Sequence, residues 1–160
     1  MKPIYTLIAA LSFSILLPAM ASGQTSSGSF QPIGDDRCLS RGPIGFSLAG
    51  CSTANQISFE NLGQIQMNSE CVFVQAGGGQ GTDFFTSGTT LMARSCSDST
   101  IPSVNGEWML DSGNHQIRLA NPPDPAVEKC LSIAGPIGVL RAVIKDCDEF
   151  GVTQWQFHPG

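Results

Sequence analysis

The sequence predicts an all-β protein built from three repeats of about four short strands each. Three observations lead to this fold class: a composition poor in helix-forming charged residues, an even number of cysteines, and sequence words that recur in the same order. Charged residues make up 13% of the 160 residues, which also include 18 Gly and 10 Pro. That charged fraction is about half the usual quarter, and such a composition favours short strands and turns over long helices.

The N-terminal segment is typical of a cleavable export signal. Lys2 is followed by an apolar run at residues 4–17 and by the small-residue pattern Ala19-Met20-Ala21. A charged start, a short apolar stretch and an A-x-A site predict a signal peptide at residues 1–21, and the run falls short of the ~20 residues of a membrane span. A signal anchor is the alternative. We therefore expect a protein secreted to the extracellular space or the periplasm, without membrane insertion.

The charge of the chain argues against nucleic acid as a partner. The net charge is −5, and one of the 8 basic residues is Lys2, inside the predicted signal peptide. No polybasic run exists, so the phosphate contacts that dominate nucleic-acid binding have no basis in this sequence.

All 6 cysteines follow the predicted cleavage site, and an even count in an exported chain predicts three disulfides. The count alone leaves 15 connectivities open. The sequence has no C-x-x-C motif and only 2 histidines, so we expect neither a zinc site nor any other cofactor.

Two sequence words identify the repeat. C-L-S and G-P-I-G occur in this order from Cys38 and again from Cys130. The copies lie about 92 residues apart, or twice a period of about 46, so a middle copy should begin between them, and Cys71 is its candidate. We place the repeats at about 28–62, 63–113 and 114–160, after a short tail: residues 22–27.

The same strand signals recur in each repeat. A strand precedes the first cysteine, apolar alternation precedes the second, and an apolar pair at period two follows, which predicts a further strand. These pairs are Ile57/Phe59, Trp108/Leu110 and Trp155/Phe157. One repeat cannot bury its apolar face alone, so we expect about twelve strands that close around an axis and leave few exposed sheet edges.

Pairing the cysteines inside each repeat would staple the same loop three times, and we prefer this connectivity. The pairs are Cys38–Cys51, Cys71–Cys96 and Cys130–Cys147. Each closes a loop of roughly 14 to 26 residues, and loop-entropy estimates give such a bond about 3 kcal/mol of stabilisation.

With these features the chain resembles the ricin-B lectin family, over about residues 28–160. The family pattern is a C-L-type start, a second Cys and a Q-x-W motif in each repeat, and its fold is a β-trefoil. The cysteine pairs and C-L-S starts match, and the Trp is kept as Trp108 and Trp155 and replaced by Ile57. An apolar slot tolerates this replacement and a stacking platform does not, so we expect both Trp rings to pack in the core.

The resemblance also implies a sugar site that this chain has lost or rebuilt. Galactose-binding members carry a carboxylate two residues after the first Cys, where its oxygens accept hydrogen bonds from sugar hydroxyls. Here Ser40, Phe73 and Ser132 stand at that position. The Asn that completes the site is kept as Asn105, and Asn55-Gln56 matches only with a one-residue gap. Carbohydrate binding would then use a non-standard site.

The long loop of the second repeat offers a replacement. It contains a Gly-rich run, residues 77–81, followed by Asp83, Phe84 and Phe85. A carboxylate beside aromatic rings suits a rebuilt sugar or protein site, and the alternative is a loop whose rings fold back on the core. The candidate ligand-binding residues are therefore Asp83, Phe84, Phe85, Asn105, Asn55 and Gln56.

The sequence contains no constellation for catalysis. Acidic clusters at residues 35–36 and 146–149 read as solvated faces, whereas glycoside hydrolysis needs two positioned carboxylates. We expect a non-enzymatic binding module for a glycan or glycoprotein. The alternative is a protein partner, as for a secreted effector, a toxin binding subunit or a protease inhibitor. A shallow pocket with an acid beside an aromatic, near Asp83 or Asp98, would favour sugar; a protruding loop at Phe84-Phe85 would favour protein.

Overall fold

The computed structural model describes residues 25–74, 85–136 and 138–160, which form twelve short strands. The first repeat contributes β1 (Ser26–Pro32), β2 (Arg37–Arg41), β3 (Phe46–Gly50) and β4 (Ile57–Phe59). The second contributes β5 (Ile65–Met67), β6 (Glu70–Phe73), β7 (Met92–Ser95), the 3-10 turn η2 (Ser103–Gly106) and β8 (Trp108–Asp111). The third contributes β9 (Gln116–Leu119), β10 (Lys129–Ala134), β11 (Arg141–Asp146) and β12 (Trp155–Pro159). The all-β class and the number of strands are confirmed.

The predicted signal peptide, residues 1–21, lies outside the described residues. Of the predicted tail, residues 22–27, the last two belong to β1, which begins at Ser26. Within the described ranges, no helix has the length and the apolar character needed to cross a membrane.

The first and fourth strands of each repeat close into a six-membered ring. Between repeats, β4 pairs with β5, β8 with β9 and β12 with β1. Within each repeat the ring closes where a residue ahead of the first cysteine meets the fourth strand: Gly28 with Ile57, Gly63 with Trp108, and His115 with Trp155. The last two joints are backbone hydrogen bonds of 2.7 and 2.6 Å from the tryptophan N–H to the partner carbonyl. Closure leaves the barrel strands without a free edge.

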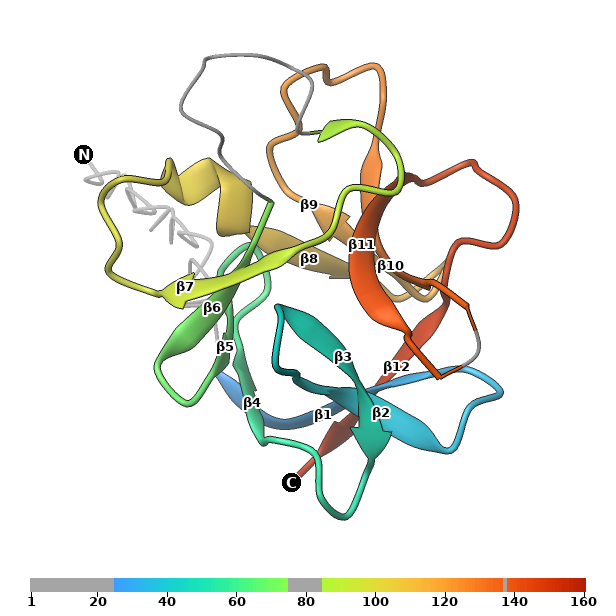
Figure 1. The fold of residues 1–160 in the computed structure, drawn as a ribbon. Helices are drawn as coiled ribbons and strands as arrows, with labels where there is room; N and C mark the ends of the chain where they lie inside the picture. Colours follow the sequence, from blue (N-terminus) through green and yellow to red (C-terminus); the bar gives the residue numbers. More distant parts are fainter. Residues whose placement is uncertain (1–24, 75–84, 137) are drawn as a thin grey trace, which may run out of the picture.

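The second and third strands of each repeat form three hairpins, β2–β3, β6–β7 and β10–β11, which cap the barrel. Figure 1 shows them arranged around the centre of the view. The hairpins touch there: the Leu91 N–H donates to the Ala142 carbonyl at 2.9 Å, and the Ile144 N–H donates to the Thr89 carbonyl at 2.9 Å. A Cβ atom on Gly45 would lie only 2.5 Å from the Leu91 carbonyl oxygen. The hairpins therefore meet at a pseudo-threefold axis.

Each hairpin is closed by a disulfide, and the pairing inferred from the repeats is confirmed. The three bonds join Cys38 to Cys51, Cys71 to Cys96, and Cys130 to Cys147, with Cα–Cα distances of 4.8, 4.9 and 5.0 Å. In each hairpin the first cysteine lies opposite the residue two places before the second cysteine. The disulfide therefore links the base of the second strand to the end of the third.

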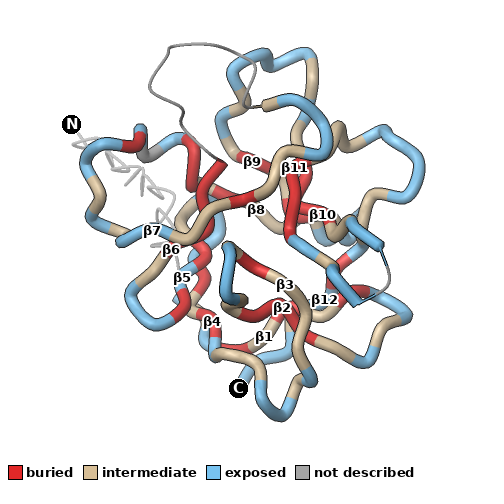
Figure 2. Tube along the Cα trace, in the orientation of Figure 1, coloured by how far each residue is buried: buried red, intermediate tan, exposed pale blue. Residues whose placement is uncertain are grey.

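One apolar core fills the barrel and the inner side of the hairpins, and Figure 2 shows the buried stretches following the strands. Equivalent positions of the three repeats contribute to it together. The residue five places before the second cysteine is fully buried in every repeat: Phe46, Leu91 and Ala142. Phe30 of β1 packs edge-on against Phe59 and Trp155, with ring centroids 5.2 and 6.5 Å apart. All three repeats therefore contribute residues to one shared core.

Trp108 and Trp155 are the largest buried side chains, and both rings are completely inaccessible. Each indole N–H donates to the carbonyl of the residue that follows the first cysteine of its repeat. Trp108 Nε1 reaches the Val72 oxygen and Trp155 Nε1 reaches the Leu131 oxygen, both at 2.9 Å. Ile57, at the equivalent place, is equally buried and carries no donor. The two rings pack in the core and cannot stack on a sugar.

Replacing Trp155 by Phe should lower the free energy of unfolding by about 2–4 kcal/mol, because it removes a buried hydrogen bond and leaves a cavity. Urea unfolding of the oxidised protein measures this. Ile57→Val is the matched control at the equivalent position and should cost only about 0.5–1.5 kcal/mol. A Trp155→Phe variant as stable as the control would contradict the role assigned to the indole hydrogen bond.

Candidate functional site

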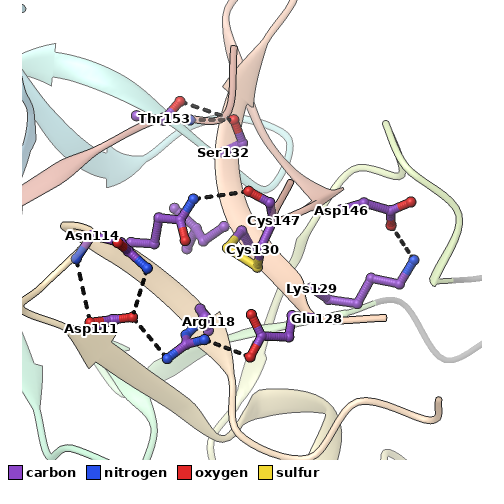
Figure 3. The surroundings of a disulfide bond; sticks show 12 residues. Asp111, Asn114, Arg118, Glu128, Lys129, Cys130, Ser132, Asp146, Cys147 and Thr153 are labelled. Carbon is purple, nitrogen blue, oxygen red and sulfur yellow. Dashed lines mark hydrogen bonds and ion pairs between the residues drawn. A yellow bond between two sulfur atoms is a disulfide. The ribbon is translucent and has the colours of Figure 1, made fainter. Parts of the chain in front are cut away.

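Two of the three family sugar positions are buried and serve the structure. The hydroxyls of Ser132 and Thr153 lie 3.0 Å apart, and the Thr153 oxygen accepts the Ile133 N–H at 2.9 Å; Figure 3 shows the Ser132–Thr153 contact. In the first repeat the Ser40 hydroxyl donates to Asn55 Oδ1 at 3.0 Å, and the same oxygen accepts the N–H of the next residue, Arg41, at 3.1 Å. These polar atoms hold the second strand to the fourth and are not offered to a ligand.

The second repeat replaces this polar pair with an apolar one. Phe73 is buried at the family carboxylate position, and Gly106 stands where the other repeats have Asn55 and Thr153. A Cβ atom on Gly106 would lie 2.4 Å from the Phe73 ring, so the ring fills the space that a side chain would need. The strand-to-strand contact is kept by the backbone, because the Val74 N–H donates to the Asn105 carbonyl at 2.9 Å. Phe73 and Gly106 are therefore a coupled substitution.

Among the candidate ligand residues named from the sequence, Phe85, Asn105 and Gln56 lie in different surroundings. Asp83 and Phe84 lie outside the described residues. Phe85 is half-buried and packs against the core, as the alternative interpretation of that loop expected. Asn105 is buried in η2, and Gln56 is exposed beside the C-terminal Gly160.

A different feature has the character of a ligand site: a hollow of about 610 Å³ between the first and third repeats, hereafter the rim hollow. It is lined by the turn at residues 32–35 and the loop at residues 147–154, with Gln116, Ile133 and Leu48 among the side chains between them. The two segments are joined directly, because the Ile33 N–H donates to the Gln154 carbonyl at 2.8 Å. The rim hollow thus lies next to the third-repeat family position, since Thr153 is part of its lining.

The first wall of the rim hollow is a tight turn. The Asp35 N–H donates to the Pro32 carbonyl at 3.1 Å, and Gly34 has a φ of 87°, which an L side chain rarely adopts. The Gln31 amide donates to the Asp35 carbonyl at 2.6 Å and fixes the turn to β1. Ile33 stands at the turn's tip and is 47% exposed.

The second wall is a turn of the same kind. The Val152 N–H donates to the Glu149 carbonyl at 3.3 Å, and Gly151 has a φ of 78°. Phe150 stands at the tip, the place that Ile33 holds in the first turn, and its side chain is 99% exposed. Each wall therefore presents one apolar side chain and one acidic side chain, since Asp35 and Glu149 both line the hollow.

Both carboxyl groups are held in the ionised form. Arg37 donates to the two oxygens of Asp35 at 2.8 and 2.6 Å, and these hydrogen bonds lower the pKa of Asp35 from 3.8 to about 2. A hydrogen bond from the Ser87 hydroxyl lowers the pKa of Glu149, and the ammonium of Lys145, 3.1 Å away, lowers it further. An ionised carboxylate only accepts hydrogen bonds, so the rim hollow offers acceptors to a ligand that donates.

The base of the rim hollow rests on the third disulfide, whose surroundings appear in Figure 3. The Gln116 amide of β9 donates to the Cys147 carbonyl at 3.0 Å and ties the start of the loop to the barrel. Cys147 is covalently joined to Cys130 of β10. The loop that carries Phe150 therefore starts from a fixed point.

Residues 149–151, which line the rim hollow, carry a sequence signal that resembles the one in the long loop of the second repeat. Glu149-Phe150-Gly151 has the same acid, aromatic and glycine content as the loop around Asp83. Because its neighbours are acidic, the sequence pattern at Glu149 predicts a solvated surface. A pocket with an acid beside an aromatic lies at Glu149 and Phe150 and not at Asp98, which is half-buried and bonded to Thr100. The other expected place, Asp83, lies outside the described residues.

No protein-family model matches the sequence, and no curated protein matches it. Among solved structures, the chain is similar to the β-trefoil lectin of the Vibrio vulnificus hemolysin/cytolysin, solved with N-acetyl-D-lactosamine bound. The TM-score is 0.59 at 13% identity, over 84% of this chain and 95% of that chain. The chain is a β-trefoil. The fold that the ricin-B resemblance implied is thereby confirmed.

Two plant proteins give the same result. The agglutinin from Abrus precatorius matches with a TM-score of 0.64 at 13% identity, over 88% of this chain and 51% of that chain. A non-toxic homologue of type II RIPs from Momordica charantia, in complex with α-methyl-D-galactoside, matches with a TM-score of 0.60 at 13% identity, over 85% and 48%. This chain therefore spans about half the length of the plant chains.

The coupling of Phe73 and Gly106 is testable in a double-mutant cycle. Gly106→Asn alone should destabilise the protein by about 1–3 kcal/mol through overpacking, and Phe73→Ser alone should leave a cavity. The double variant recreates the Ser–Asn pair of the first repeat. It should be more stable than the sum of the single effects predicts by at least about 1 kcal/mol. Additive losses in urea unfolding would show that the two positions are independent.

The Asp35–Arg37 pair makes a pH-dependent prediction. Because the folded-state pKa is lowered, the pair stabilises the protein above pH 3.8 and loses this contribution as the pH falls toward about 2. Arg37 is 41% exposed, so solvent screens the pair and we expect a small contribution. Asp35→Asn should remove that part of the acid sensitivity in urea titrations, whereas Asp148→Asn, at an exposed acid of the same region, should not. Identical acid profiles for Asp35→Asn and the wild type would refute this contribution.

Proposed function

We propose that this protein is an exported, non-enzymatic lectin that binds carbohydrate in the rim hollow. The observation that carries the proposal is the position of Phe150, which is 99% exposed at the edge of a hollow of about 610 Å³. A phenylalanine held entirely in water on a tight turn gains nothing for the folded chain. A sugar ring placed against it would cover apolar surface on both sides.

The polar lining supports a hydroxyl-rich ligand. Asp35 and Glu149 are ionised acceptors on the two walls, and sugar hydroxyls are donors that such carboxylates bind strongly. The amides of Gln116 and Gln154 add both donors and acceptors to the same hollow. A few polar groups of this kind, beside apolar surface, are the usual composition of a small-molecule site.

The same carboxyl groups argue for binding over hydrolysis. A glycosidase needs one carboxyl group that stays protonated near neutral pH, and therefore one with a raised pKa. In the rim hollow the pKa of Asp35 and that of Glu149 are both lowered. The pair can accept hydrogen bonds from a sugar but cannot protonate a leaving group.

The structural comparisons are consistent with a neutral sugar as ligand. The Vibrio lectin was solved with N-acetyl-D-lactosamine and the Momordica protein with α-methyl-D-galactoside. This chain lacks a carboxylate at the family position, so its sugar would bind on the outer side of Thr153, in the rim hollow. The loop with Asp83 and Phe84 stays a second proposed contributor.

Export fits the covalent structure. Three disulfides persist in oxidising compartments, and the predicted signal peptide would direct the chain to one of them. We therefore propose that the mature chain acts outside the cell or in the periplasm.

Binding of a protein partner is the second candidate. It is favoured by two exposed aliphatic side chains at the hairpin tips, Ile44 at 65% and Val139 at 52%. Ile44 belongs to the first G-P-I-G word and Val139 directly follows the second, and both line one hollow of about 290 Å³. Exposed apolar groups that gather in this way mark contact surfaces more often than isolated ones do.

A glycan array of neutral oligosaccharides, probed with the oxidised mature chain, tests the proposal. Phe150→Ala should weaken binding to any glycan that scores by about tenfold or more, because it removes the apolar platform. Its unfolding free energy should stay within about 0.5 kcal/mol of the wild type, since the side chain makes no core contact. Leu62→Ala, at another exposed apolar residue, is the matched control and should bind normally.

The array also distinguishes the two alternatives, a sugar site in the long loop of the second repeat and a protein partner. Glycan binding that Phe150→Ala leaves intact but Asp83→Ala abolishes would move the site to the long loop of the second repeat. A blank array with folded, fully oxidised protein would reject the lectin proposal for those sugars and favour the protein partner.

A further inference from the structure

The described residues hold seven basic side chains, and five of them are paired with carboxylates. Figure 3 shows two of these: Arg118 with Asp111 and Glu128, and Lys129 with Asp146. The remaining pairs are Arg37–Asp35, Arg41–Glu70 and Lys145–Glu149. In the described part of the chain, Arg94 and Arg141 have no carboxylate within ion-pair distance, and both are exposed. Among the described residues of this acidic chain, two arginines therefore have no ion-pair partner.

The two unpaired arginines line the same hollow. It has a volume of about 290 Å³, lies where the hairpins meet, and is hereafter the axial hollow. Its lining includes the residue six places before the second cysteine of every repeat: Gly45, Thr90 and Arg141. Arg94 enters from β7 of the second repeat and Arg141 from the start of β11 in the third, so the two charges come from different hairpins.

The axial hollow exists because the three equivalent positions carry unequal side chains. Gly45 has a φ of 68° and its Cα faces the Leu91 carbonyl so closely that no side chain fits there. Thr90 is short and pairs across to Val143. Arg141 is long enough to reach over the space that these small residues leave. Ile44 forms an exposed apolar edge of the same hollow.

We propose that the axial hollow binds the acidic group of an anionic glycan, a sulfate or a carboxylate, between Arg94 and Arg141. Two guanidinium groups offer planar donor forks to one oxyanion, a geometry in which charge-assisted hydrogen bonds are strong. The Thr90 hydroxyl adds a neutral donor, and Ile44 offers apolar contact to the sugar ring. This site is separate from the rim hollow and does not depend on the function proposed for it.

The surrounding charge defines the ligand class more closely. Asp98 is near enough to Arg94 for the two to interact, but its carboxylate is engaged by Thr100 at 2.6 Å and forms no ion pair with the arginine. The chain as a whole is acidic, so a long polyanion that needs many phosphate contacts would be repelled outside this hollow. A sugar with one or a few acidic groups matches two arginines and a small hollow.

The test uses the oxidised mature chain and biolayer interferometry. The probes are an immobilised heparin-derived octasaccharide, its desulfated counterpart, which keeps the carboxylates, and a neutral oligosaccharide of the same length. We expect at least one acidic probe to bind about tenfold or more tightly than the neutral one. The double variant Arg94→Gln/Arg141→Gln should bind that acidic probe about tenfold or more weakly. The desulfated probe tells sulfate from carboxylate recognition.

A charge-matched control excludes a general electrostatic effect. Gln66→Glu/Gln156→Glu lowers the net charge by the same amount at exposed positions of β5 and β12 that do not line the axial hollow, and should bind within about twofold of the wild type. Absence of wild-type binding to both acidic probes would overturn the proposal. Equal weakening in both double variants would also overturn it, and so would preference for a phosphorylated peptide over every acidic glycan. Loss of neutral-sugar binding in Phe150→Ala leaves this result unaffected, so the two sites can fail separately.

Discussion

Two indole rings fix the hairpins of the cap to the barrel, and the rest of the structure depends on these contacts. Trp108 and Trp155 lie on barrel strands, and each donates its ring N–H to a hairpin strand of its own repeat. The disulfide of the same repeat closes the hairpin next to that carbonyl. Each of these hairpins is therefore held at two points, one covalent and one in the core. In the first repeat, where Ile57 has no donor, the Ser40–Asn55 contact provides the second link.

The core and the disulfides stabilise the fold, so positions outside them can carry different side chains in the three repeats. The position two residues after the first cysteine, where the ricin-B resemblance implies a carboxylate, holds a structural hydrogen bond in two repeats and a packed Phe73 in the other. Exposed apolar and charged side chains line hollows at two other places. One is the pair of turns that present Ile33 and Phe150, and the other is the axis where the hairpins meet. The fold alone therefore does not locate a binding surface, as expected when function resides in sites.

Features that recur in each repeat could be predicted from the sequence. Contacts between segments far apart in the chain could not. The strand predicted ahead of each first cysteine is present, and Gly28, Gly63 and His115 in these segments each meet the fourth strand of their repeat. The rim hollow joins residues 32–35 to residues 147–154, which no local pattern connects. Glu149 looked like one member of a solvated acidic cluster, since its neighbours are acidic too. The turn that lifts Phe150 beside it depends on Gly151, whose positive φ a single sequence does not reveal.

The position of the axial hollow limits how many ligands one chain can hold there. A point on a rotation axis occurs once, however many repeats surround it, whereas a site inside a repeat can occur three times. Arg94 and Arg141 come from different hairpins and both line that single hollow. Engagement at the axis is therefore monovalent for each chain. Bridging two cells or two polymer strands through it would require a second chain, so avidity would have to come from self-association or from fusion to another module.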